Sequence, residues 1–157
     1  MKLLALLLLF FSGFTKAPFN DSNKEMEYIR MSYGKAVSDK KLCKTMIETL
    51  KNKSENSVNL AYLGAFKTIW AHHAINPISK LSTFNKGKKY IESAVKQNPD
   101  NVEIRFVRLS VQKNCPSFLG YNDEIDQDVA FINANKHRIA SQQLNKMIAE
   151  IIKKELP

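Results

Sequence analysis

The chain has 157 residues, of which 24 are Lys or Arg and 15 are Asp or Glu, giving a formal net charge of +9 at pH 7. This length suffices for one domain with a hydrophobic core of its own. The basic residues are spread along the sequence and form no known nucleic-acid motif or aromatic-interleaved patch, so we expect no nucleic-acid partner.

Residues 1–17 have the three-part layout of a secretory signal peptide. Met1-Lys2 supplies a positive start, Leu3 to Phe14 carry no charge, and Thr15-Lys16-Ala17 places small residues at the −3 and −1 positions of a cleavage site. The apolar run has about twelve residues, whereas a membrane span needs roughly twenty. We therefore expect release rather than anchoring, although Pro18 blurs the cleavage site.

Export has consequences for the rest of the sequence. The first cysteine is Cys43, far from the apolar run, so lipid attachment is not expected and the protein should be periplasmic or secreted. Residues 18–157 then form a single helical domain with a charge of +7, because residues 1–17 contain two lysines and no acid. In an oxidising compartment Cys43 and Cys115 could form a disulfide. Two buried, unpaired thiols are the alternative.

The sequence after the signal peptide predicts about seven helices with short connectors and no convincing strand. Asp39 and Asn76-Pro77 are favourable helix starts, and Asp21 and Asp123 are further candidates for N-caps. The expected helices cover, approximately, residues 21–37, 39–50, 58–74, 77–97, 102–112, 123–135 and 139–155.

The segment 102–112 is the ambiguous one. Its apolar residues partly alternate with polar ones, which is typical of a strand. Val107 breaks the alternation, and Asp100-Asn101-Val102-Glu103 reads as a capping box. A lone strand in a helical chain would also leave its backbone groups without partners. We therefore predict a helix.

Part of the sequence resembles a degenerate tetratricopeptide repeat. Gly87, Ile91, Ala94 and Pro99 reproduce the small, bulky, small and proline positions of that repeat's second half. Leu63-Gly64 looks like its Leu-Gly pair but stands farther upstream than usual. Small residues let paired helices approach closely. The resemblance implies an all-α, right-handed stack of antiparallel helix pairs.

A second resemblance covers roughly residues 60–135. The segments that carry it are Tyr62-Leu63-Gly64-Ala65, Asn76-Pro77, Asn101 to Phe106 and Pro116 to Tyr121. They look like a group of small exported bacterial helical proteins. That likeness implies the helical fold and export, and no activity.

Four side chains are candidates for a binding groove, and two of them have a competing structural interpretation. Arg105 and Arg108, together with Glu103, interrupt a very apolar segment, so our preferred interpretation is an ion pair that holds helices together. A ligand-anchoring arginine is the alternative. The groove candidates are His73, Arg105, Arg108 and Tyr121.

Motifs for catalysis or for metal and cofactor binding are not recognisable. His72 and His73 are adjacent, so on a helix they point about 100° apart and do not suit one metal ion. The acids of residues 123–128 suit a helix N-terminus. The sequence contains no Gly-rich phosphate loop, Gly-x-Ser-x-Gly elbow or His-Glu-x-x-His pair. We expect no metal and no cofactor.

Helical repeats bind partners through extended concave surfaces. The sequence therefore favours a non-enzymatic protein that binds a peptide or protein in the cell envelope. Two alternatives stay open. One is a small exported hydrolase with a site assembled from distant residues. The other is a basic protein that docks on anionic envelope surfaces.

Overall fold

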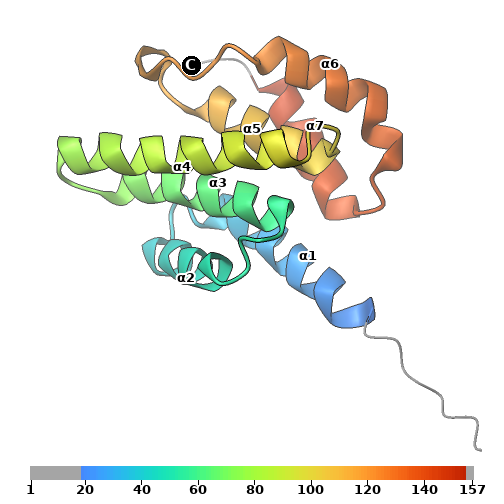
Figure 1. The fold of residues 1–157 in the computed structure, drawn as a ribbon, viewed down its shortest axis with the longest axis horizontal. Coiled ribbons are helices and arrows are strands. Elements are labelled where there is room, and N and C mark those ends of the chain that lie inside the picture. The colour runs from blue at the N-terminus through green and yellow to red at the C-terminus, as the bar shows by residue number, and fades with distance from the viewer. Residues whose placement is uncertain (1–18, 155–157) are drawn as a thin grey trace, which may run out of the picture.

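The computed structural model describes residues 19–154; the expected signal peptide lies outside the described residues. Within that range the chain is all-helical, with seven α-helices and no strand, as predicted (Figure 1). None of these helices is both long and apolar enough to cross a membrane. The helices are α1 (Phe19–Lys35), α2 (Lys40–Lys51), α3 (Ser57–His73), α4 (Pro77–Gln97), α5 (Val102–Asn114), α6 (Ile125–Asn135) and α7 (Gln142–Lys153), with 3₁₀ turns η1 (Ser117–Leu119) and η2 (Lys136–Arg138).

Side-chain caps set most of the helix starts. Asp39 accepts a hydrogen bond from the Leu42 amide, and Asn76 accepts two at the start of α4, which confirms both predicted starts. Two other predicted caps are wrong. Helix α1 begins before Asp21, and α6 begins at Ile125, after Glu124, without a side-chain cap bond at Asp123.

Segment 102–112 is helical, and its burial explains the ambiguous pattern. Helix α5 packs against α3, α4, α6 and α7, and ten of its thirteen residues are buried. A helix buried on most sides loses the stripe of apolar residues that marks a surface helix. The predicted capping box is not formed as expected, because Asn101 rather than Asp100 caps α5 and Glu103 binds other helices.

The last helix is shorter than predicted. We expected it to start at Ile139, but residues 136–138 form η2, and α7 begins at Gln142 with Ser141 as its cap. Lys113 of α5 is buried and donates to the carbonyl oxygens of Ile152 and Lys154, at the C-terminal end of α7. That ammonium group satisfies carbonyls that a helix end leaves free.

Helices α3 and α4 form an antiparallel hairpin (Figure 1). The two helices approach most closely at Gly64 and Gly87. A Cβ atom on Gly64 would lie 2.6 Å from the Gly87 carbonyl oxygen, and one on Gly87 would lie 2.5 Å from the Gly64 carbonyl oxygen. Ile91 fills the space beside Gly64 and is fully buried. The predicted close approach of a helix pair at Gly87 is therefore confirmed.

Candidate functional site

A groove runs between α1 and α7, with α5 as its floor. It consists of two adjoining cavities of about 490 Å³ and 380 Å³, and Arg30 lines both of them. We call it the α1–α7 groove. Its lining comprises Asn23, Glu27, Arg30, Met31, Tyr33, Gly34 and Lys35 of α1, residues 100–103, Phe106 and Ser110 of α5 and its cap, and residues 138–141, Gln143, Leu144, Met147, Glu150, Ile151 and Lys154 around α7.

Helical spacing in the sequence creates each wall. On α1 the lining positions 23, 27, 30 and 34 are spaced by three or four residues, so they share one face. The floor positions 102, 106 and 110 of α5 and the wall positions 144, 147 and 151 of α7 are spaced in the same way. Three helical faces thus converge on one groove.

Arg30 is fixed at the junction of the two cavities. Its guanidinium donates to both carboxylate oxygens of Glu103 at 2.7 Å and to Glu27 at 2.7 Å. The Tyr62 hydroxyl donates to the same Glu103 carboxylate at 2.9 Å. Burial by itself lowers the pKa of Arg30, but the Glu103 carboxylate outweighs it and raises that pKa overall. The two-pronged contact joins α1 to α5, and the Tyr62 hydroxyl adds α3 to the same carboxylate.

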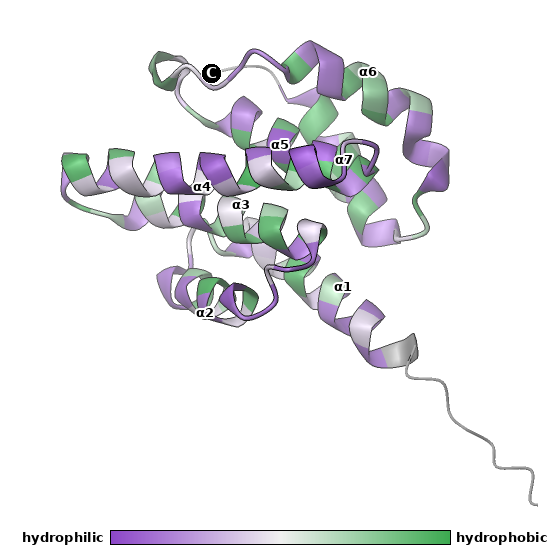
Figure 2. Cartoon of the chain, in the orientation of Figure 1, coloured by the Kyte–Doolittle hydropathy of each residue, from purple (hydrophilic) through white to green (hydrophobic). Residues whose placement is uncertain are grey.

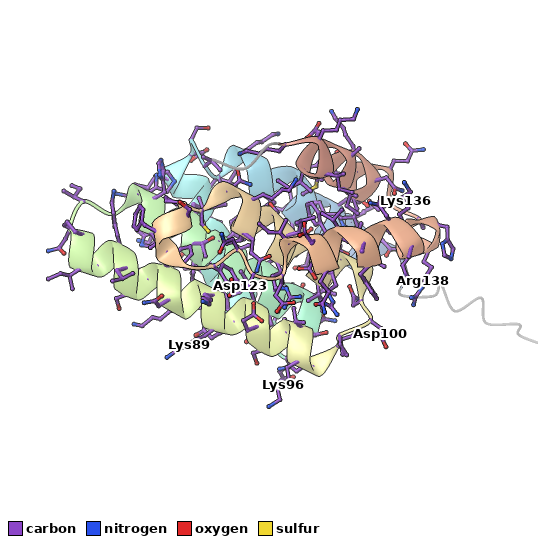
Figure 3. All side chains as sticks on the ribbon, turned by 90° about the horizontal axis from the view of Figure 1, so that it is seen from above. Lys89, Lys96, Asp100, Asp123, Lys136 and Arg138 are labelled. Carbon is purple, nitrogen blue, oxygen red and sulfur yellow. The ribbon has the colours of Figure 1, made fainter. Side chains whose placement is uncertain are left out.

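The two ends of the groove differ in chemistry. At the first end the N-termini of α5 and α7 converge through their caps Asn101 and Ser141, and Asp100 and Arg138 lie at the same end of the molecule (Figure 3). The second end is more apolar, with Met31, Phe106, Met147 and Ile151 in its lining.

Charges balance over the groove as a whole. The lining carries four basic side chains and four acidic ones, so their formal charges cancel. The basic side chains are Arg30, Lys35, Arg138 and Lys154, and the acidic ones are Glu27, Asp100, Glu103 and Glu150.

Arg105, Arg108 and Tyr121, predicted as groove residues, come together at a different place. Asp128 of α6 is fully buried and accepts from Arg108 Nε at 2.7 Å, Arg108 Nη2 at 2.8 Å and Arg105 Nη1 at 2.9 Å. Arg108 also pairs with Glu92 of α4 at 3.2 Å. The preferred interpretation of these arginines, an ion pair between helices, is confirmed.

Tyr121 and His73 are likewise engaged inside the fold. Tyr121 donates to Glu92 at 2.6 Å and packs edge-on against Phe84; burial, followed by the Glu92 contact, raises its pKa. His73 Nε2 is 2.9 Å from the Ala36 carbonyl oxygen and ties the end of α3 to the end of α1. None of the four predicted residues lines either cavity of the α1–α7 groove.

The two cysteines are free and buried in different surroundings, so the disulfide considered from the sequence is not formed in this structure. The Cys43 thiol donates to the Phe66 carbonyl at 3.3 Å, whereas Cys115 lies beside the carbonyls of Gln112 and Tyr121. Burial raises the pKa of Cys43 to about 11 and also raises that of Cys115. Such thiols are poor nucleophiles at neutral pH.

Sequence reasoning missed the groove residues on α1 and α7. The pair Glu27 and Arg30, one turn apart, was a usable signal, because an i,i+3 pair of opposite charge marks one helix face. Among residues 19–154 no three His, Cys, Asp or Glu side chains gather as a metal site would require. No protein-family model, curated protein or solved structure matches this chain.

Proposed function

We propose that this protein binds a peptide, or a segment of a partner protein, in the α1–α7 groove. The observation that carries the proposal is the pair of cavities between α1 and α7 that share Arg30, one polar and bordered by two helix N-termini, the other more apolar. The polar main-chain groups of a peptide suit the polar end of the groove, and its apolar side chains suit the apolar end. The role is that of a non-enzymatic interaction protein.

The helical architecture supports this role. The Gly64–Gly87 contact packs α3 and α4 as a close antiparallel pair, which suits a tetratricopeptide-like stack of helix pairs. Such stacks hold segments of other proteins along a helical surface. The signal-peptide layout of residues 1–17 suggests that the partner is met in the cell envelope.

Gly34 offers a sharp test, because it lines the apolar cavity and an added Cβ there would meet no atom within 4 Å. Gly34→Trp places a large ring where the ligand would lie, and Gly34→Ala is its matched control. Peptides are selected from a random phage-displayed library on the full chain and measured by fluorescence anisotropy. We expect Gly34→Trp to weaken peptide binding at least about tenfold. That factor corresponds to the free energy lost when one apolar side chain of the peptide can no longer be buried in the cavity.

Two results would refute the proposal. One is a selected peptide that binds Gly34→Trp and Gly34→Ala equally well. The other is a library that yields no saturable binder of the folded chain. Circular dichroism spectra of both variants, matching that of the natural chain, show that the fold is intact.

A further inference from the structure

The turn between α3 and α4 exposes apolar side chains at one end of the molecule. Ile75 is 94% exposed, Ile78 81% and Leu81 50%. We call these three residues the hairpin tip. Figure 1 shows this turn reaching beyond the ends of α2 and α5, and Figure 2 shows hydrophobic residues in the first turn of α4. Three large apolar side chains gathered on a protruding turn are typical of an interaction surface.

The hairpin that carries this tip has no acidic residue over a long stretch. Between Glu55 and Glu92 the sequence contains no Asp or Glu and five lysines, which are Lys67, Lys80, Lys86, Lys88 and Lys89. Figure 3 shows Lys89 projecting outward from α4. Another lysine, Lys40 of α2, lies 5.4 Å from the ring of Trp70 near the end of α3.

Lys67, in the middle of α3, lies close enough to two other lysines to be influenced by them. Burial lowers the pKa of Lys67, and the neighbouring Lys51 and Lys86 lower it further. Glu92, the first acid after the stretch, is engaged by Arg108 and Tyr121. The hairpin therefore presents a positive field, and an anionic surface is its complement.

We propose that the hairpin tip inserts into the surface of a lipid bilayer with anionic headgroups. The tip is a convex projection, so it suits a soft apolar layer, whereas a protein partner needs a broad complementary surface of about 800 Å². Apolar side chains of interfacial segments sit about 5–10 Å deep, at the boundary between the headgroups and the acyl chains. Lys80, two residues after Ile78, then lies near the lipid phosphates, and the lysines farther along α4 add attraction to the anionic surface from a greater distance.

This mode of docking is independent of the α1–α7 groove. None of the tip residues lines either groove cavity, so a membrane-docked molecule keeps its groove open. Docking would hold a peptide-binding surface close to a bilayer. The two proposals can therefore fail separately: a chain that binds no peptide can still dock on a bilayer, and a chain that docks on no bilayer can still bind a peptide.

The test places an environment-sensitive NBD fluorophore on the full chain through Ile75→Cys. Cys43 and Cys115 are buried with raised pKa values, so the new exposed thiol reacts first. Lys146→Cys, on the exposed side of α7, is the matched label position. Vesicles of phosphatidylcholine, with and without phosphatidylglycerol, are the probe. With phosphatidylglycerol present, we expect the label at residue 75 to shift to the blue and to be quenched by brominated lipid.

Substitutions then separate the apolar and electrostatic contributions. Ile78→Ser should weaken partition into anionic vesicles at least about tenfold, since it removes an apolar side chain from the bilayer. Tyr28→Ser, which removes an exposed apolar side chain of α1, should leave partition unchanged. Lys80→Glu should weaken binding to anionic vesicles and leave the weak binding to neutral ones as it was.

Three outcomes would overturn the proposal. The first is a vesicle-bound chain whose label at residue 75 keeps its aqueous spectrum, which would assign the contact to another part of the chain. The second is a blue shift without vesicles that grows with protein concentration, which would make the tip a contact between copies. The third is the absence of binding to either kind of vesicle.

Discussion

Replacing Gly64 by alanine tests the helix packing on which the fold depends. The new Cβ would lie 2.6 Å from the Gly87 carbonyl oxygen and 2.7 Å from Ile91 Cγ1. Ordinary contact begins at 3.4 Å, so α3 and α4 would have to separate by about 0.8 Å. Backbone atoms cannot rotate away as a flexible side chain does, so the strain falls on the helix pair.

The size of the effect follows from two opposing terms. Overpacking a tight core costs about 1–3 kcal/mol, and contacts with backbone place Gly64→Ala near the upper end. Alanine recovers about 1 kcal/mol of helix propensity over glycine. We expect a net loss of about 2 kcal/mol in the free energy of unfolding, which lowers Tm by about 4–8 °C for a chain of this size.

Gly34→Ala is the matched control, because Gly34 is also helical but has open space around it. It should leave stability unchanged or raise it by up to about 1 kcal/mol. Urea unfolding followed by circular dichroism measures both variants. Equal stabilities for Gly64→Ala and Gly34→Ala would refute the packing described here. The Gly64→Ala, Gly87→Ala double variant should lose less than the sum of the single losses, because one separation relieves both contacts.

Two further predictions concern buried polar groups. Asp128→Ala removes the fully buried carboxylate of Arg108 and leaves that guanidinium only the half-exposed Glu92 and Glu124, so it should destabilise the chain by about 3 kcal/mol in urea unfolding. Glu48→Ala, which breaks an exposed ion pair, should cost less than about 1 kcal/mol. Similar losses for the two variants would contradict the ion-pair assignment. Burial raises the pKa of Tyr33 from 10 to about 12. The neutral hydroxyl therefore contributes fully to the free energy of unfolding below pH 10, and this contribution is lost as the pH rises through 12. The loss amounts to about 3 kcal/mol. Urea unfolding across that window should show a smaller decline for Tyr33→Phe than for the natural chain, and an equal decline would contradict the assignment.

Local features of the fold were predictable because local chemistry decides them. Asp39 and Asn76 cap helices from within their own turn, so sequence reasoning found those starts. Asp123 failed as a cap because α6 begins two residues later, at Ile125, and its start has no side-chain cap bond. The strand-like pattern of α5 has its cause in packing on several sides, which no local window reveals.

The groove was out of reach because its residues are distant in sequence. Arg30 and Glu103 are 73 residues apart, and the facing wall of α7 lies later still. Charged residues on an apolar segment indicated that Arg105 and Arg108 form an ion pair inside the fold, and the structure confirms that interpretation. Their partner Asp128 was assigned to a helix N-terminus, since sequence does not show which acid faces inward.

Methionine methyl NMR of the full chain with a library-selected peptide tests the binding groove most directly. Met31 and Met147 stand on opposite walls of the groove, whereas Met46 is buried outside it and Met26 is not part of the lining. If the peptide binds in the groove, the methyl signals of Met31 and Met147 shift together and saturate at one ligand concentration, while that of Met46 stays in place. Saturable binding that leaves Met31 and Met147 unmoved would contradict it.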